Sequence, residues 1–345
     1  MVTRRAARGA LVGVVGLAAA AGIGTVLVRR RSGLTAEGPS EAGAVLKPDE
    51  LLHVPTFEPR IVPVVTDDGA ELHVRVYGDH DAQPIVFSHG WTCSADFWAP
   101  QINAFAEKYK VIVYDQRGHG RSDVGTRLLG PDVLADDLAD VLAATVTEDN
   151  KAVLVGHSMG GMSVMAWAGR YPDQVDSLVS AVLLASTATD SLVRETTVIP
   201  LPTRFPRVPV PVGRVVLKSA VPLRPSPVTR QAIKYVSMAP SATPAEVAFC
   251  EKIVLECAPR TRGIWGAALS DLDIYEALAN MSVPTTVLVG TADRLTPPVH
   301  ARRLAEALES HDHLSKYIEV PGVGHMSSVE AIDDVNSEIL RLRSL

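Results

Sequence analysis

The five residues Gly-His-Ser-Met-Gly at positions 156–160 constrain the fold of this chain more than any other feature. They follow directly on an apolar run at 153–155, and a helical pattern begins after them. Glycine on both sides of a serine predicts a tight strand-to-helix turn, in which neighbouring backbone comes close and larger side chains do not fit. In such a turn the hydroxyl of Ser158 stands above the edge of a sheet, with strained backbone angles.

The surrounding pattern supplies the strands and helices of an α/β fold. Asp67-Asp68-Gly69 separates two strand-like runs and predicts an antiparallel hairpin. The later runs are short and apolar, as in parallel strands that are covered on both faces. Helical periodicity separates them, which predicts a mostly parallel central sheet with helices on both faces. The predicted strands are 61–65, 71–77, 84–90, 111–115, 152–156, one within 177–186, 284–290 and 316–320, and the predicted helices include 132–146, 162–170 and 299–309.

The alternation of strands and helices stops between about residues 187 and 271. Proline-rich sequence comes first there, helical patterns follow, and the next strand begins only near Pro284. We therefore predict that residues 188–272 form a cap insertion over the sheet. Residues 51–187 and 273–345 form the core in this interpretation.

The N-terminal segment has a different composition. Residues 10–28 form a 19-residue run without a charge, and arginines flank it on both sides. A helix of this length roughly crosses the ~30 Å hydrocarbon core of a bilayer. We expect residues 1–31 to form a transmembrane anchor in the cell membrane, of open orientation. The alternative is a signal peptide whose cleavage releases a secreted protein. The Gly/Pro/Ser-rich residues 32–50 predict a flexible linker.

Composition and charge exclude several classes of function. The net charge is −6, and we find no basic cluster beyond the N-terminal segment, so nucleic acid is not an expected partner. The three cysteines give no disulfide framework, and no His/Cys cluster has zinc spacing. We expect no metal and no organic cofactor. The oligomeric state stays open.

A serine at such a turn needs a base, and the base needs a group to orient it. His325 lies in a glycine-rich loop after the last predicted strand, where it can reach the carboxyl ends of the strands. Asp293 follows the strand 284–290 within three residues, and Asp190 and Asp312 are alternatives. The chain order of Ser158, Asp293 and His325 is the one expected for nucleophile, acid and base in this kind of fold.

Two backbone N–H groups must stabilise the oxyanion that forms during acyl transfer. The Met159 amide, at the start of the helix, is one candidate. The second is the Trp91 amide, in the loop that follows the strand ending at Ser88. We also expect the Trp91 indole to bind substrate by shaping the acyl pocket.

Five motifs, in order, resemble those of the α/β-hydrolase fold superfamily over about residues 60–340. They are FSHGW (87–91), YDQRGHGRSD (114–123), GHSMGG (156–161), GTADRLTPP (290–298) and GVGHM (322–326). They are similar to those of bacterial esterases, cofactor-free haloperoxidases/perhydrolases and monoacylglycerol lipases. Epoxide hydrolases and haloalkane dehalogenases share the capped fold but use an aspartate nucleophile, where this chain has Ser158.

The resemblance implies a serine hydrolase that cleaves carboxylic esters through an acyl-enzyme, without a cofactor. It also implies that residues 118–122 form a structural loop after a strand, and not a phosphate-binding loop. The apolar cap and the predicted anchor favour a small-molecule ester or lipid substrate with a lipophilic acyl group. The alternatives are perhydrolase or haloperoxidase-like activity, acyl transfer by the same residues, and a catalytically silent binding protein.

Overall fold

The computed structural model describes residues 48–78, 81–198, 214–215 and 217–345. The predicted anchor or signal segment (1–31) lies outside these residues, as does most of the predicted linker. Among the described residues, no helix has the length and apolarity that crossing a membrane requires. The 3₁₀-helix η1 (Pro48–Leu52) spans the predicted boundary at residue 51, and the Leu51 carbonyl accepts a 2.9 Å hydrogen bond from Asn103 Nδ2.

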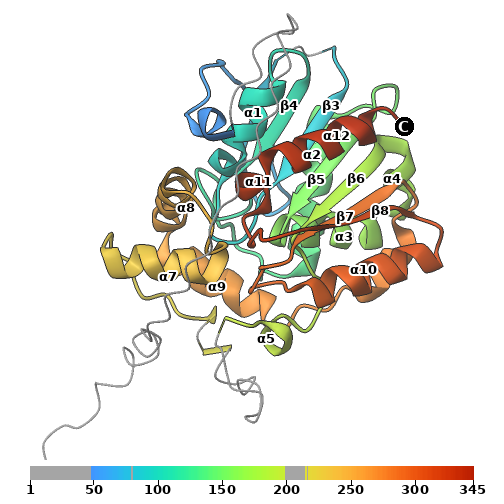
Figure 1. Cartoon of the computed structure of the whole chain (residues 1–345). Coiled ribbons are helices and arrows are strands. Elements are labelled where there is room, and N and C mark those ends of the chain that lie inside the picture. Colours follow the sequence, from blue (N-terminus) through green and yellow to red (C-terminus); the bar gives the residue numbers. More distant parts are fainter. Residues whose placement is uncertain (1–47, 79–80, 199–213, 216) are drawn as a thin grey trace, which may run out of the picture. The chain divides into compact units, whose positions relative to one another are not determined.

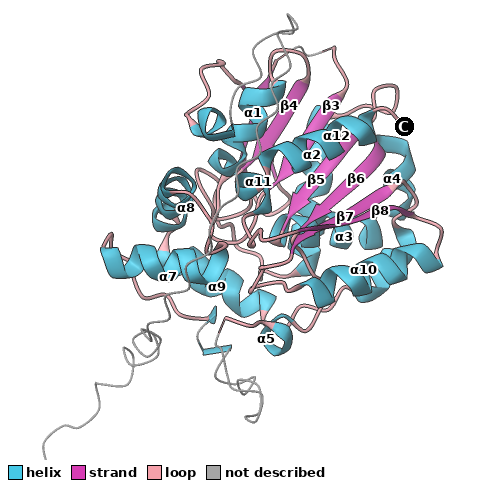
Figure 2. Cartoon of the chain, in the orientation of Figure 1, coloured by secondary structure: helices cyan, strands magenta, loops and turns pink. Residues whose placement is uncertain are grey.

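Eight described strands form one sheet in the order β1-β2-β4-β3-β5-β6-β7-β8 (Figures 1 and 2). β1 and β2 are antiparallel, as the turn at Gly69 predicted, and β2 is also antiparallel to β4. All other neighbours are parallel, which confirms the mostly parallel sheet. The strands are β1 (Arg60–Val65), β2 (Glu71–Tyr77), β3 (Pro84–Ser88), β4 (Lys110–Tyr114), β5 (Ala152–His157), β6 (Val179–Ala185), β7 (Thr285–Gly290) and β8 (Leu314–Val320).

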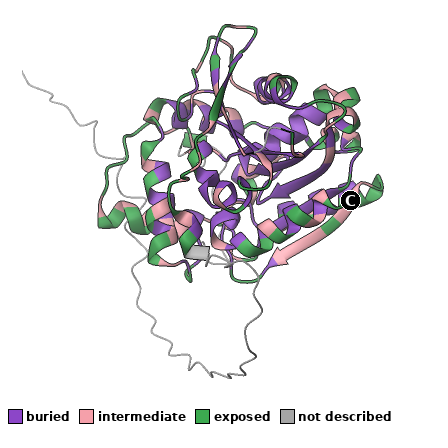
Figure 3. Cartoon of the chain, turned by 90° about the horizontal axis from the view of Figure 1, so that it is seen from above, coloured by how far each residue is buried: buried purple, intermediate pink, exposed green. Residues whose placement is uncertain are grey.

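Successive side chains of the central strands belong to two separate hydrophobic clusters, one on each face of the sheet. In β5, Leu154 packs into one cluster, whereas Val153 and Val155 pack into the other. This two-sided burial explains the continuously apolar strand sequences, and Figure 3 shows the central strands almost entirely buried.

Helices supply the other half of both clusters, which confirms the predicted layers. The helices packed with Leu154 are α2 (Pro131–Thr145), α3 (Met159–Arg170) and α10 (Pro298–Ser310). Those packed on the opposite face are α1 (Ala99–Phe105) and α12 (Ile332–Arg343), with η2 (Ala95–Trp98) beside them. The short α4 (Pro172–Leu178) leads into β6, and α11 (Ser327–Glu330) precedes α12.

The chain between β6 and β7 is helical in its described part and contains no strand there. Figure 1 shows four of these helices gathered past the carboxyl ends of the parallel strands, namely α5 (Leu192–Glu195), α7 (Pro227–Ser237), α8 (Pro244–Glu256) and α9 (Pro259–Leu269). The 3₁₀-helix η3 (Tyr275–Asn280) follows them, packs against α3 and leads into β7. α7, α8 and α9 each begin with proline, whose fixed φ suits the first helical position. The cap role predicted for residues 188–272 stays a prediction.

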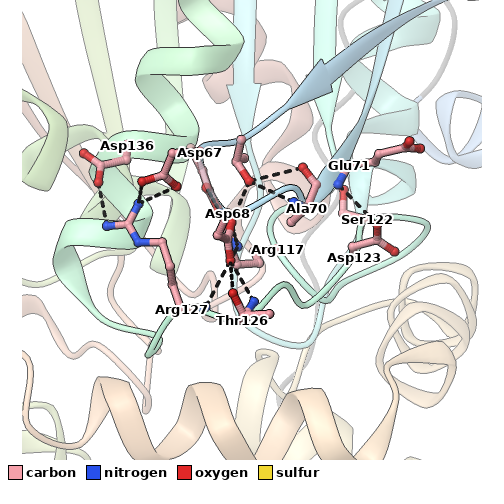
Figure 4. Close-up of polar contacts among 12 residues, drawn as sticks. Asp67, Asp68, Ala70, Glu71, Arg117, Ser122, Asp123, Thr126, Arg127 and Asp136 are labelled. Atoms are coloured by element: carbon pink, nitrogen blue, oxygen red, sulfur yellow. Dashed lines mark hydrogen bonds and ion pairs between the residues drawn. The ribbon is translucent and has the colours of Figure 1, made fainter.

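The loop after β4 is held by a fully buried arginine. Arg117 Nη1 lies 2.8 Å from Asp68 in the β1–β2 turn, and Nη2 lies 2.7 Å from Asp137 in α2. Asp68 also accepts a hydrogen bond from the Thr126 amide (Figure 4). On the other side of the loop, Trp265 Nε1 of α9 donates to the Arg117 carbonyl at 2.8 Å. One side chain therefore joins the hairpin to a helix of the core, and its backbone joins both to α9.

Replacing Arg117 by methionine should strongly destabilise the fold, because it leaves two buried carboxylates without their cation. We expect Arg117→Met to lower the free energy of unfolding by about 3–5 kcal/mol, measured by urea denaturation. The control is Arg302→Met, whose ion pair with Glu319 is exposed and should contribute less than about 1 kcal/mol. Equal effects of the two substitutions would contradict the structural role assigned to Arg117.

Candidate active site

Ser158 occupies the predicted strand-to-helix turn between β5 and α3. Its backbone has φ 53° and ψ −118°, a conformation that L-residues rarely adopt. A Cβ on Gly160 would collide with the Ser88 carbonyl, and one on Gly156 would lie 2.6 Å from Gly161 Cα. Both motif glycines are therefore required by close backbone packing.

Hydrogen bonds to the end of β6 hold this strained turn. The Ser158 N–H donates to the Ala185 carbonyl at 3.0 Å. The Ser158 carbonyl accepts a 2.6 Å bond from Thr187 Oγ1, a buried hydroxyl. The sequence analysis did not identify Thr187, because nothing in the chain near Ser158 indicates which residue after β6 meets it.

The loop after β3 lies against Ser158, as the sequence predicted. A Cβ on Gly90 would lie only 3.1 Å from Ser158 Cβ, so the backbone before Trp91 passes close to the serine. The backbone N–H groups of Trp91 and Met159 donate no hydrogen bond to any described residue. Both amides are therefore available to a ligand beside Ser158.

The buried His89 side chain holds the loop after β3 in place by hydrogen bonds. Its Nδ1 donates to the Gly90 carbonyl at 2.8 Å, and its Nε2 accepts from the Gln116 amide at 2.9 Å. Burial lowers the pKa of His89 to about 4, so the ring is neutral and can accept and donate at the same time. These two hydrogen bonds give His89 a structural role in holding the loop.

Asp293 and His325 meet, although 32 positions separate them in the chain. His325 Nδ1 lies 2.9 Å from Asp293 Oδ2, and both side chains are buried. Thr296 Oγ1 donates to the same carboxylate oxygen at 2.8 Å and lies 3.1 Å from His325 Nδ1. The amides of Leu295 and Thr296 bond the other oxygen, so the carboxylate is fixed in orientation.

The alternative acids lie elsewhere. Asp190 pairs with Arg303 at 3.0 Å, and Asp312 is exposed in a turn with positive φ. Neither contacts His325 among the described residues. In the same part of the chain, no group of His, Cys, Asp and Glu side chains has an arrangement that could hold a metal ion.

Of the three predicted residues, the structure joins Asp293 and His325 by a hydrogen bond. Within the described chain, no hydrogen bond joins the Ser158 hydroxyl to the His325 ring. The two are linked through His157, the residue before the serine. Its ring nitrogen Nε2 donates to the His325 carbonyl at 2.8 Å, and the two imidazole rings lie 5.0 Å apart. Catalytic hydrogen bonds are often long in ligand-free enzymes and shorten when substrate binds.

His157 is a neutral spacer and not a second base. Burial, together with the nearby His325, lowers its pKa to about 3. Since Nε2 donates to a carbonyl, the neutral ring has its lone pair on Nδ1, which is buried and unpartnered among the described residues.

The carboxyl end of α7 holds the loops of both Asp293 and His325. The amides of His325 and Met326 donate to the Ser237 carbonyl at 3.0 and 3.2 Å. Arg294, which follows Asp293, donates to the Tyr235 carbonyl at 2.8 Å. These last carbonyls of a helix have no partner within it, and the two loops satisfy them.

The Glu330 side chain also joins the chain just after α7 to the loop of His325. One carboxylate oxygen accepts hydrogen bonds from the Ala239 amide at 2.7 Å and from the Gly324 amide at 3.2 Å. Burial raises the pKa of Glu330 to about 7, although both amide bonds favour the ionised form. The sequence analysis missed Glu330, because no motif marks it and its partners are distant in the chain.

Trp91 connects the site to α9. Its indole Nε1 donates to the Arg262 carbonyl at 3.1 Å, and a Cβ on Gly266 would lie 3.0 Å from the ring. The indole is half-buried between the loop after β3 and this helix. The predicted substrate contact of Trp91 stays a prediction, since the structure contains no ligand.

The pKa of Glu330 predicts a pH dependence of stability. Its pKa in the folded chain lies above the ordinary glutamate value of 4.5, so the unfolded chain releases this proton first as pH rises. Stability is therefore lost between pH 4.5 and about 7, by up to about 3 kcal/mol. We expect Glu330→Gln, which cannot ionise, to gain stability over the wild type across this window.

Urea denaturation at pH 5, 6, 7 and 8 measures this difference. Glu309→Gln, at an exposed position of α10, should show a difference from the wild type that is constant with pH. A constant difference for Glu330→Gln as well would contradict the assignment.

Comparisons with known proteins identify the family and the fold. A sequence profile of the alpha/beta hydrolase family matches residues 85–338. A bifunctional esterase/perhydrolase of Acinetobacter calcoaceticus is 29% identical over 80% of this chain and 97% of its own length. A non-heme chloroperoxidase of Streptomyces lividans is 43% identical over 34% of this chain and 44% of its own.

Solved structures show the same fold. An esterase from Rhodococcus sp. ECU1013 superposes with a TM-score of 0.65 at 26% identity, over 82% of this chain and 98% of its own. An enol-lactonase from Burkholderia xenovorans LB400 has a TM-score of 0.65 at 22% identity, over 82% of this chain and 100% of its own. The matched profile spans most of the chain, and the sheet and its helices have the expected order. The chain therefore belongs to the alpha/beta hydrolase family.

Proposed function

We propose that this protein is a serine hydrolase that cleaves carboxylic esters through an acyl-enzyme. The observation that carries the proposal is the buried Asp293–His325 pair, 2.9 Å apart, beside the strained turn at Ser158. A carboxylate that accepts the Nδ1 proton leaves Nε2 of the ring as a base. A serine fixed in this turn is the nucleophile that such a base activates.

The proposed reaction uses the Ser158 hydroxyl, the His325 ring and two backbone amides, with water as the second reactant. His325 Nε2 takes the proton of the Ser158 hydroxyl as Oγ attacks the ester carbonyl. The amides of Trp91 and Met159 donate to the oxyanion, and the positive end of α3 adds to the stabilisation. The protonated His325 gives its proton to the leaving alcohol. Water, deprotonated by the same ring, then releases the acid and restores the serine.

A lipophilic acyl group is the favoured substrate class. Trp91 places an aromatic ring beside the proposed oxyanion site, between the loop after β3 and α9. The name of the Acinetobacter relative includes perhydrolase activity, which supports a second candidate function. In that reaction hydrogen peroxide replaces water as the acceptor and the acyl-enzyme yields a peracid. Acyl transfer to an alcohol would use the same residues.

Hydrolysis of p-nitrophenyl esters from acetyl to palmitoyl tests the proposal on the full chain. We expect turnover by the wild type and a loss of at least about 10⁴-fold in kcat for Ser158→Ala. Ser163→Ala is the matched control. It removes another buried hydroxyl of the same helix, bonded to Gln116 at 2.9 Å, and should keep activity within about tenfold.

The acyl-length optimum separates a small-ester esterase from a lipase-like enzyme. Repeating the assay with hydrogen peroxide and measuring peracid tests the perhydrolase alternative. Turnover that survives in Ser158→Ala would refute the proposed nucleophile. A folded wild type without any ester turnover would refute broad esterase activity. It would favour an enzyme with a narrow substrate range, acyl transfer to a specific acceptor, or a catalytically silent binding protein.

A further inference from the structure

The segment of residues 214–230 carries an unusual surface. Four of its apolar side chains are largely open to solvent, with exposed fractions of 70% at Val215, 66% at Val221, 40% at Leu223 and 73% at Val228. Four basic residues lie among them, namely Arg214, Lys218, Arg224 and Arg230. We call these eight residues the apolar-basic patch. Isolated exposed apolar residues are common, but such a group within one short segment indicates an interaction site.

The stretch of sequence that contains the patch carries a net charge opposite in sign to that of the whole chain. Residues 196–245 contain seven lysines and arginines and no aspartate or glutamate, although the net charge of the whole chain is −6. The sequence analysis was wrong to find no basic cluster beyond the N-terminal segment, because the net charge averages over this stretch.

Two of the four basic residues of the patch have no described counter-ion. Arg214 pairs with Asp271 and Arg230 with Glu251, both at 2.6 Å. Lys218 and Arg224 form no ion pair with any described residue. Both are exposed, so their charge is available to an external partner.

We propose that the apolar-basic patch docks on an anionic lipid surface. Exposed valines and a leucine can enter the boundary between headgroups and acyl chains, while arginine and lysine contact lipid phosphates. A second copy of the chain is a poorer fit, because a twofold contact would bring two basic patches together. The docking does not depend on the predicted anchor (residues 1–31), which lies outside the described residues.

The patch lies next to α9, the helix that accepts the hydrogen bond of the Trp91 indole. Close backbone packing joins them, since a Cβ on Gly266 would collide with the Leu217 carbonyl and one on Gly263 would lie 3.0 Å from the Lys218 carbonyl. The Arg262 guanidinium bonds the Val221 carbonyl, and the Arg262 carbonyl accepts from Trp91. A docked membrane would therefore lie one helix away from the proposed oxyanion loop.

A fluorescent probe at the patch tests the docking in the full chain. The three native cysteines are buried, so an environment-sensitive dye will label an introduced exposed cysteine selectively. The test position is Leu223→Cys. The control is Leu340→Cys in α12, where the native leucine is 41% exposed, against 40% for Leu223. Each labelled protein is mixed with vesicles of phosphatidylcholine alone or with about 30% phosphatidylglycerol.

We expect a blue shift of the probe at position 223 only with phosphatidylglycerol vesicles, and none at position 340. Adding Lys218→Glu and Arg224→Glu should raise the vesicle concentration that gives half of that shift by about tenfold or more. Lys108→Glu with Arg121→Glu makes the same change of charge at exposed positions outside the patch and should leave it unaltered. Vesicle binding through the predicted anchor alone would move neither probe.

Three results would overturn the proposal. One is an unshifted probe at position 223 on anionic vesicles. Another is a shift that is equal at positions 223 and 340, or that survives the reversal of Lys218 and Arg224. The third is a shift that grows with protein concentration in the absence of lipid, which would assign the patch to self-association. None of these readouts uses ester turnover, so this test is independent of the proposed reaction.

Discussion

The left-handed backbone of Ser158 is the constraint on which the rest of the site depends. A side chain held at φ 53° is costly, and it persists only where its surroundings fix it. β5 lies between β3 and β6, so the loops after those two strands meet the serine from both sides. The loop after β3 contributes Gly90 and Trp91, the end of β6 contributes the Ala185 carbonyl, and the loop that follows contributes the Thr187 hydroxyl. The parallel sheet thus gathers short local motifs into one site.

The helices inserted between β6 and β7 are part of that site's framework. The carboxyl end of α7 binds the loops of both Asp293 and His325. Glu330 strengthens the contact with the His325 loop by accepting a hydrogen bond from the Ala239 amide, just after α7. α9 binds the Trp91 indole on one side and the Arg117 carbonyl on the other. A movement of these helices would therefore act on acid, base and oxyanion loop together. This arrangement gives the docking proposed for residues 214–230 a physical route to the reacting groups.

The sequence predicted those features whose determinants are local. Ser158, Asp293, His325, Trp91 and Met159 each follow a strand within a few residues, and the strands themselves are short apolar runs. The sequence did not reveal the roles of Thr187, Glu330 and the α7 carbonyls. Their partners lie far away in the chain, and no local pattern indicates the contact. The turn after Asp293 could have been found, since an aspartate side chain often accepts a hydrogen bond from the backbone two residues on. The order of the strands also came only from the structure.

The most direct test of the central claim is covalent labelling of the full chain with a fluorophosphonate. The Ser158 oxygen would attack phosphorus and fluoride would leave, which gives a stable adduct that mass spectrometry can locate. We expect one adduct per chain, on the tryptic peptide 152–170, with fragment ions that place it on Ser158 and not on Ser163. An adduct at another residue, or equal labelling of Ser158→Ala, would contradict the assignment of Ser158 as the nucleophile.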